Sequence, residues 1–159
     1  MAVAFSPAAQ AKFETIVKRY PVKRAALMPT LWLAQTEFGY LSEDVMVYVA
    51  ELLGLSPATV ASVASFYTMY YKKPMGRHHV QVCTNLSCTL LGADHILDCL
   101  RRRLGIAVGE TDAAGKFSLS EAECLGSCGT APMMQVNDDF CENLTPESTL
   151  EIIDRLERS

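Results

Sequence analysis

The stretch HHVQVCTNLSC, residues 78–88, indicates how the C-terminal half of this 159-residue chain folds. Its first six residues, HHVQVC, contain two valines and follow closely on Gly76, which predicts a short β-strand. Residues 90–104 then carry apolar side chains at helical spacing, namely Ala93, Ile96, Leu97, Leu100 and Leu104. Gly105 is placed to end that helix. A strand followed by a helix is the beginning of a strand–helix–strand unit.

The rest of the C-terminal half completes a small sheet. KFSLSEAE, residues 116–123, alternates apolar and polar side chains as a half-buried strand does. MMQVNDDFCENL, residues 133–144, is typical of a hairpin that turns on Asn137 and Asp138. Thr-Pro-Glu at residues 145–147 can cap a last helix. The order predicts a thioredoxin-like layout, in which a parallel strand pair and an antiparallel hairpin share a four-stranded mixed sheet.

The N-terminal half contains clear signals for helix starts. Ser6-Pro7 and Ser56-Pro57 each place a capping hydroxyl before a proline suited to the first helical turn. Pro29 can open a second helix, and Ser42 precedes a third. The apolar face expected for this third helix consists of Val45, Val47, Val49, Leu52 and Leu53. Four short helices are therefore expected before the aromatic run FYTMYY.

The boundary between the two halves lies after this run, where Lys72, Lys73, Pro74 and Gly76 interrupt any regular pattern. The predicted fold class is mixed α/β (α+β). An N-terminal helical bundle, residues 1–76, is followed by a thioredoxin-like domain, residues 77–159, that contains the four-stranded mixed sheet.

Four of the six cysteines form two closely spaced pairs. Cys83 and Cys88 (C-x4-C) follow the first predicted strand of the C-terminal half, and Cys124 and Cys128 (C-x3-C) follow the second. Because the carboxyl ends of parallel strands lie at the same edge of a sheet, the two loops should meet there. No signal peptide is recognisable, so the cysteines are expected to be free thiols or metal ligands and not disulfides. Four thiolates are the ligand set of a [2Fe–2S] cluster.

Other residues in these loops suit such a cluster. Gly126 and Gly129 would let the backbone curl closely around the metal. Thr84, Ser87 and Ser127 can donate hydrogen bonds to sulfur, and a helix starting near Cys88 would direct its positive end at the site. The residues alone leave three alternatives open: a four-cysteine zinc site, a redox-active dithiol and chance burial of four cysteines. The dithiol is disfavoured because the usual C-x-x-C spacing is absent.

The remaining cysteines and the histidines are interpreted as structural. Cys99 falls within the predicted helix and Cys141 within the hairpin, where a cysteine is usually a small apolar side chain. His78 and His79 begin a strand at the domain boundary, and His95 lies on an amphipathic helix. Surface or boundary positions, and not metal ligation, are expected for all three histidines.

Charge argues against a nucleic-acid partner. The net charge is −4 and the pI is near 5.3, so there is no broad basic surface for a polyanion. SPATVASVASFY, residues 56–67, resembles a helix-turn-helix segment, and a zinc- or cluster-stabilised DNA-binding module is the alternative of a different class. That segment contains no Lys or Arg, which counts against DNA binding. The most apolar stretch, residues 45–55, is too short for a membrane span and contains Glu51, so a cytoplasmic protein is expected.

Beyond these local patterns, nearly the whole chain resembles one family. AALMPTLWLAQTEFGYLSEDVMVYVAELLG, VASFYTMY, VCTNLSC, ECLGSCGTAPMMQVND and ENLTPE are similar to the thioredoxin-like [2Fe–2S] ferredoxin subunits (NuoE type) of bacterial NADH:quinone oxidoreductase, respiratory complex I. The resemblance implies that Cys83, Cys88, Cys124 and Cys128 bind one [2Fe–2S] cluster and that the chain carries electrons as one subunit of an oxidoreductase.

The resemblance also implies partners. FMN and NADH are expected on a flavin-bearing, NADH-binding subunit (NuoF type), from which the cluster receives single electrons, and further subunits of the complex are expected beside it. The chain itself has no Gly-rich dinucleotide motif. It would be cytoplasmic and peripheral to the inner membrane through the complex, without inserting into the membrane. Similar small subunits occur in NAD-dependent formate dehydrogenases and NAD-reducing hydrogenases. In thioredoxin-like folds the position of Pro132 often holds a cis-proline.

Overall fold

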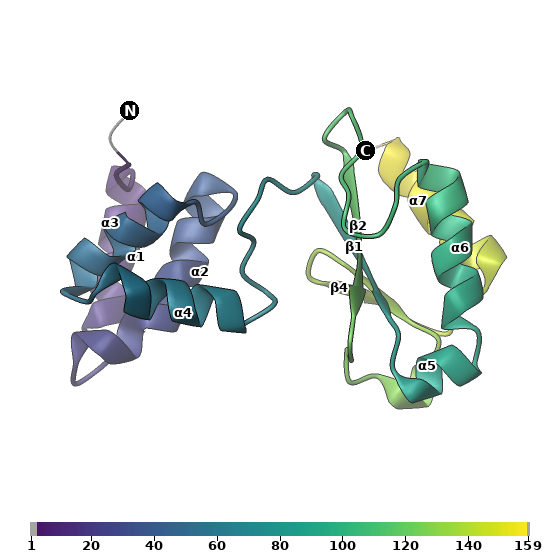
Figure 1. Ribbon diagram of the computed structural model, residues 1–159, viewed down its shortest axis with the longest axis horizontal. Coiled ribbons are helices and arrows are strands. Elements are labelled where there is room, and N and C mark those ends of the chain that lie inside the picture. Colours follow the sequence, from purple (N-terminus) through teal and green to yellow (C-terminus); the bar gives the residue numbers. More distant parts are fainter. Residues whose placement is uncertain (1–2, 159) are drawn as a thin grey trace. The chain divides into compact units, whose positions relative to one another are not determined.

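A computed structural model describes residues 3–158 of the chain. It divides the chain into two compact units, one ending at Pro74 and the other beginning at Met75, two residues before the boundary expected from the sequence. Across the described residues there are seven α-helices and one four-stranded mixed sheet, which confirms the predicted α/β class. The two units are described separately below (Figure 1).

The N-terminal unit is helical, as predicted. Its elements are α1 (Pro7–Val17), the 3-10 helix η1 (Lys23–Ala26), α2 (Leu27–Phe38), α3 (Glu43–Leu53) and α4 (Pro57–Phe66). The hydroxyls of Ser6, Ser42 and Ser56 each accept a backbone N–H in the first turn of the following helix, as expected. Helix α2 begins two residues before Pro29, because η1 leads directly into it and the first turn of a helix has no need of the missing proline N–H.

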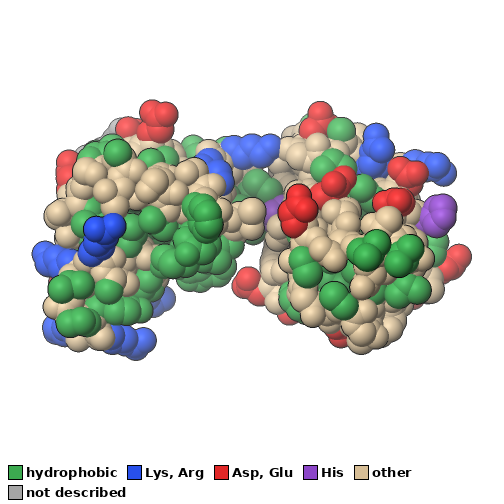
Figure 2. Space-filling model, turned by 60° about the horizontal axis from the view of Figure 1, so that its bottom comes forward, with side chains coloured by type: hydrophobic (Ala, Val, Ile, Leu, Met, Phe, Trp, Pro, Cys, Tyr) green, Lys and Arg blue, Asp and Glu red, His purple; other side chains and the backbone are tan. Residues whose placement is uncertain are grey.

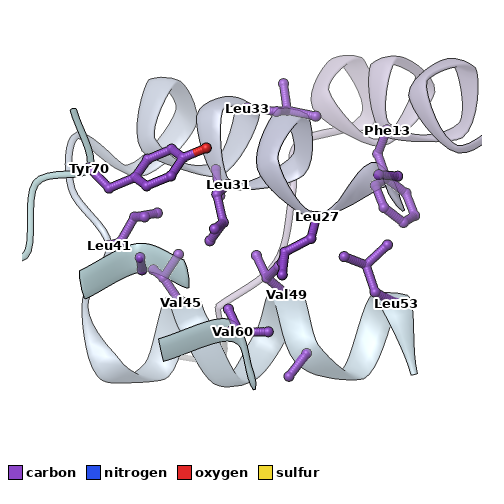
Figure 3. Close-up of a cluster of buried hydrophobic side chains, with 14 of the residues drawn as sticks. Phe13, Leu27, Leu31, Leu33, Leu41, Val45, Val49, Leu53, Val60 and Tyr70 are labelled. Carbon is purple, nitrogen blue, oxygen red and sulfur yellow. The ribbon is translucent and has the colours of Figure 1, made fainter. Parts of the chain in front are cut away.

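The core of this unit is built from the inner faces of α2, α3 and α4. Figure 3 shows Leu31, Val49 and Val60 pointing toward one another, and all three are fully buried. Tyr70 closes one side of the core, and its hydroxyl donates a hydrogen bond of 2.9 Å to the Met28 carbonyl. The prediction that Val47 faces inward is wrong: it is 40% exposed, because two residues along a helix correspond to about 200° of rotation from Val45.

No single helix among the described residues is long and apolar enough to cross a membrane. Helices α3 and α4 together have the length and apolar composition of a membrane span, but they are bent by 120° at the break between them. The core helices of a soluble protein can have the same length and composition, and the apolar side chains Val45, Val49 and Val60 of these helices are buried within the unit.

The C-terminal unit contains the sheet. Its strands are β1 (His78–Cys83), β2 (Phe117–Ala122), β3 (Met134–Val136) and β4 (Asp139–Cys141), in the spatial order β2-β1-β3-β4. Strands β1 and β2 are parallel, and β3 pairs antiparallel with both β1 and β4, as predicted. The helices are α5 (Leu86–Leu90), α6 (Ala93–Leu104) and α7 (Pro146–Glu157), with the 3-10 helix η2 (Cys128–Thr130). Helices α6 and α7 lie together on one face of the sheet, while α5 lies at its end (Figure 1).

The helix predicted over residues 90–104 begins three residues later in the structure. Gly92 has a φ of 100°, a backbone conformation that ordinary L-residues rarely adopt, and α6 begins only after it at Ala93. The preceding residues form the separate five-residue helix α5. The end of α6 at Gly105, with φ at 67°, agrees with the prediction.

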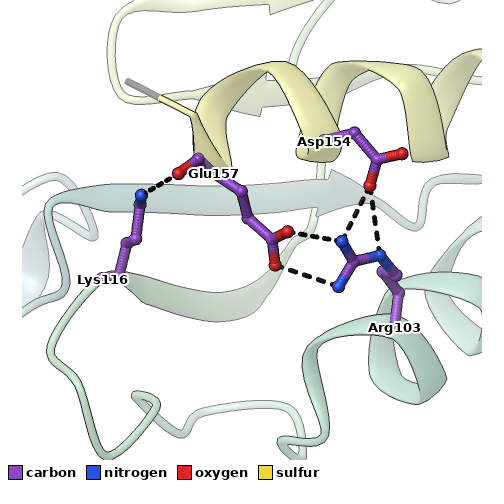
Figure 4. A network of polar contacts seen from close by, with 4 residues as sticks. All are labelled: Arg103, Lys116, Asp154 and Glu157. Atoms are coloured by element: carbon purple, nitrogen blue, oxygen red, sulfur yellow. Dashed lines mark hydrogen bonds and ion pairs between the residues drawn. The ribbon is translucent and has the colours of Figure 1, made fainter.

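An arginine on α6 joins that helix to α7. Arg103 Nη2 lies 2.8 Å from Asp154 Oδ1, and its Nη1 donates to Glu157 Oε1 at 2.9 Å. Figure 4 shows Lys116 meeting the backbone carbonyl of Glu157 in the same network. Since all these groups are partly exposed, water and salt weaken the attraction, and the apolar contacts between the helices and the sheet dominate.

The core of the N-terminal unit provides a direct test. Replacing the fully buried Leu31 by Ala should lower the free energy of unfolding by about 2–5 kcal/mol, because the substitution removes apolar contacts and leaves a cavity. Val47→Ala, which truncates an exposed side chain on α3, should change it by less than about 0.5 kcal/mol. Urea unfolding of the full chain measures both values, and similar losses for the two variants would contradict this description of the core.

Candidate metal centre

The two cysteine pairs leave the sheet at the same edge. The parallel register runs from His78 opposite Phe117 to Cys83 opposite Ala122, so both strands end together. Cys83 is the last residue of β1, and Cys124 follows two residues after the end of β2. The structure therefore brings together the loops that the sequence pattern assigned to one edge.

The four thiols differ sharply in exposure. Cys83 and Cys88 are buried, at 2% and 1% exposure, and both belong to the hydrophobic core of the C-terminal unit. Cys124 and Cys128 are exposed. One side of the site is thus set into the core, and the other faces outward.

Electrostatic coupling links all four thiols. Cys88 and Cys124 help to lower the pKa of Cys83. The charges of Cys83 and Cys128 help to raise the pKa of Cys88. The cysteines thus occupy one neighbourhood, although across residues 3–158 no three Cys, His, Asp or Glu side chains form a preshaped site for a single metal ion.

Backbone N–H groups act on the sulfurs. The N–H of Gly126 donates to Cys124 Sγ at 3.3 Å. Backbone N–H groups of Asn85 and Leu125 work to lower the pKa of Cys83, and that of Met133 works to lower the pKa of Cys88. Such donors stabilise anionic sulfur and are common around iron–sulfur clusters. The donor set therefore fits a cluster held by four thiolates.

The thiols also influence one another's ionisation. Burial raises the pKa of Cys83, but the N–H groups of Asn85 and Leu125 and the neighbouring thiols outweigh it and lower the pKa overall. Burial and the adjacent Cys83 raise the pKa of Cys88. One thiolate at this site thus opposes the ionisation of its neighbour, and a bound cation is needed to stabilise several thiolates together.

Some expectations about the loops are confirmed and others are not. A helix does begin near Cys88, at Leu86, but it is the five-residue α5, and the long helix α6 begins only at Ala93. Gly126 adopts a φ of 81°, the left-handed conformation that favours glycine. The hydroxyls of Thr84 and Ser127 bond to oxygen atoms, of Ala122 and Glu142 respectively. The carboxylate of Glu142 was not anticipated from the sequence, because no local pattern connects it with a loop 15 residues away.

The two remaining cysteines and the three histidines have different surroundings. Cys99 and Cys141 are half-buried, and the Cys99 thiol lies 4.0 Å from the Pro146 carbonyl. His78 and His79 begin β1 close to the boundary between the two units, as expected, but their side chains are buried, because β1 is an inner strand of the sheet. Nε2 of His79 lies 2.7 Å from Ser120 Oγ, and His95 is exposed.

The surface beside the cysteines is apolar and acidic. Leu86, Leu90 and Leu91 are 71%, 75% and 59% exposed, on or next to α5. Figure 2, which turns this end of the C-terminal unit forward, shows hydrophobic side chains spread over it. Residues 83–92 and 121–134 contain no Lys or Arg, while Glu121 and Glu123 are exposed. The peptide bond between Ala131 and Pro132, beyond the second cysteine loop, is cis.

The cysteine pattern on this fold agrees with a known family model. Residues 13–157 match the model described as thioredoxin-like [2Fe-2S] ferredoxin. The chain belongs to this family. The helical unit is included in the match, so family membership rests on far more than the cysteine spacing.

Named relatives of this ferredoxin include E subunits of NADH-quinone oxidoreductase. It is 46% identical over 133 residues to the E 2 subunit of NADH-quinone oxidoreductase from Rhizobium meliloti (strain 1021), covering 84% of this chain and 79% of that protein. It is 44% identical over 151 residues to the mitochondrial NADH dehydrogenase [ubiquinone] flavoprotein 2 of Dictyostelium discoideum, covering 93% of this chain and 61% of that protein.

One solved structure supports the fold of the ferredoxin over most of its length. An NAD+-reducing [NiFe]-hydrogenase in the air-oxidized state aligns with a TM-score of 0.73 at 19% identity. The alignment covers 83% of this chain but only 23% of the hydrogenase chain. At that identity, the likeness establishes a shared fold only.

The buried His78 predicts a pH effect on stability. Its Nε2 has no hydrogen-bond partner among the described residues, and burial, with the charges of Arg77 and Lys116, lowers its pKa. Below about pH 6.5 the His78 imidazole binds a proton more readily in the unfolded chain than in the folded ferredoxin. The free energy of unfolding therefore falls as the pH drops. In His78→Leu, the loss of stability between pH 7.5 and 5.5 should be smaller than in the wild type.

The exposed His95 supplies the control. His95→Gln should retain the wild-type dependence on pH, since that side chain is exposed on α6. Thermal unfolding at several pH values measures all three proteins. A His78→Leu variant whose stability falls as steeply with acid as the wild type would show that His78 is not responsible.

Proposed function

We propose that this ferredoxin is the [2Fe–2S] electron-transfer subunit of an NADH-oxidising complex of the NADH:quinone oxidoreductase type. The observation that carries the proposal is the meeting of Cys83, Cys88, Cys124 and Cys128 at one sheet edge, in a chain whose family is defined by such a cluster. Relatives with 45–46% identity are named as E subunits of NADH-quinone oxidoreductase, which makes that enzyme the favoured host.

In this proposal each part of the site has a distinct task. A bound cluster would supply a centre that accepts and releases one electron at a time. Cys83 and Cys88 hold its inner side and exclude water there, because both are buried. Cys124 and Cys128 hold the outer side, where an electron donor can approach. The N–H groups of Asn85, Leu125, Gly126 and Met133 stabilise negative charge on the sulfurs.

The donor in this proposal is FMN on a flavin-bearing, NADH-binding partner of the NuoF type. The chain has no Gly-rich dinucleotide motif of its own, which agrees with a separate NADH-binding subunit. Exposed leucines beside the cysteines, at 59–75% exposure, are suited to burial against a protein partner. The subunit would be attached to the membrane through other members of the complex.

A zinc ion bound in place of the cluster is the alternative metal centre, and metal analysis distinguishes zinc from an iron–sulfur cluster. Protein purified without oxygen should be reddish brown, contain iron and acid-labile sulfide in equal amounts, and give an EPR signal on reduction. Cys124→Ser and Cys128→Ser should lose the cluster or hold it weakly. Cys99→Ser and Cys141→Ser are the matched controls and should keep it. A colourless protein containing zinc, or equal losses in all four variants, would refute the assignment.

The need for a flavin partner is testable by spectroscopy. NADH alone should not bleach the visible spectrum of the isolated ferredoxin, since the proposal places NADH and FMN on the partner. Adding the purified flavin-bearing subunit should allow NADH to reduce the cluster, followed by absorbance and EPR. Reduction by NADH without the partner would contradict this division of tasks, and so would a complete lack of reduction with it.

A further inference from the structure

We infer that Glu142 is a positioning residue for the outer cysteine loop, and that it holds residues 124–130 in the conformation that retains the cluster. The inference rests on the proposed ligands Cys124 and Cys128. It concerns a carboxylate that has no place in the ligand set and that directly follows β4, 15 residues along the chain from Ser127.

The outer loop has few apolar contacts to keep it in place. Cys124, Gly126, Cys128 and Gly129 are all exposed, and only Leu125 packs against the core from within the loop. By contrast, Cys83 ends a central strand and Cys88 is buried in the core. The outer loop must therefore be fixed mainly by polar contacts.

Glu142 provides these contacts through one carboxylate oxygen. Its Oε1 accepts hydrogen bonds from Ser127 Oγ and, at 2.6 Å, from Thr130 Oγ1. Each hydroxyl has one proton to donate, so the shared acceptor brings the two hydroxyls to 2.9 Å from each other. Ser127 directly precedes Cys128, and fixing its side chain restrains the backbone that presents that thiol. Hydrogen bonds from both hydroxyls lower the pKa of Glu142, so the group is ionised at neutral pH.

The backbone around Glu142 strengthens the connection. The N–H of Asn143 donates to the Thr130 carbonyl at 2.7 Å, and that of Leu144 donates to the Pro132 carbonyl at 2.9 Å. The segment after β4 therefore runs alongside the exit of the cysteine loop, and Glu142 extends this pairing toward Ser127. Leu144 is buried, which anchors the segment in the core of the unit.

The decisive experiment compares how fast the cluster is lost. In the full-length ferredoxin with its cluster assembled, Glu142→Ala should release iron to a chelator faster than the wild type, by up to the about 10–100-fold that loss of a supporting residue costs in metal affinity. Glu142→Gln should stay within about twofold of the wild type, because the amide oxygen still accepts both hydrogen bonds. Glu151→Ala, which removes an exposed carboxylate from α7, is the matched control and should behave as the wild type.

A double substitution on the other side of the contact tests the same connection. Ser127→Ala with Thr130→Val should accelerate release as much as Glu142→Ala, and adding Glu142→Ala to it should change little more, since all three groups form one network. Additive effects would overturn the inference, as would a Glu142→Ala protein with wild-type release. So would a Glu142→Gln protein as fast as Glu142→Ala, because charge and not hydrogen bonding would then be responsible.

An experiment on metal-free protein tests this inference independently of the proposed function. If the wild type binds no iron and sulfide, the proposed function fails by itself. Hydrogen exchange of the Thr130 and Asn143 amides, which donate to the carbonyls of Ser127 and Thr130, still reports on the loop. Faster exchange at these amides in Glu142→Ala, with unchanged exchange in β1, supports the positioning role. Unchanged exchange throughout overturns it.

Discussion

The parallel pairing of β1 with β2 is the constraint on which the site depends. Six residue pairs, from His78 with Phe117 to Cys83 with Ala122, fix where both strands end. A slip by one residue would turn every side chain of a strand to the opposite face, exposing Val80 and Val82, which are fully buried. The free energy of burying this core thus fixes the edge at which four cysteines meet, even though two of them contribute nothing to the core.

The chemistry of that edge follows from what surrounds the thiols. No Lys or Arg occurs in residues 83–92 or 121–134, so no side-chain cation from these segments offsets several thiolates. The backbone supplies only partial positive charge, through N–H groups such as those of Asn85 and Leu125. Several thiolates at this edge would need a bound cation as further compensation, because neighbouring thiolates oppose one another's ionisation.

Local patterns in the sequence predicted most of the fold. The serine caps, the strand HHVQVC and the hairpin turn at Asn137 and Asp138 depend on neighbours within a few residues, and the structure confirms them. The break at Gly92 was missed, because an isolated glycine within a helical pattern does not reveal its backbone conformation. The burial of His79 and the contact of Glu142 with Ser127 depend on residues 41 and 15 positions away, which no local pattern contains.

The two halves of the cysteine site are consequently stabilised by different forces. Cys83 and Cys88 are fixed by apolar packing, which depends little on salt or pH. Cys124 and Cys128 lie on a loop fixed by hydrogen bonds to an exposed carboxylate, which competes with water for its partners. An outer loop buried as deeply as the inner one would gain stability but would close the exposed side of the cysteine site. Polar attachment of that loop reconciles exposure of the site with a fixed position of Cys124 and Cys128.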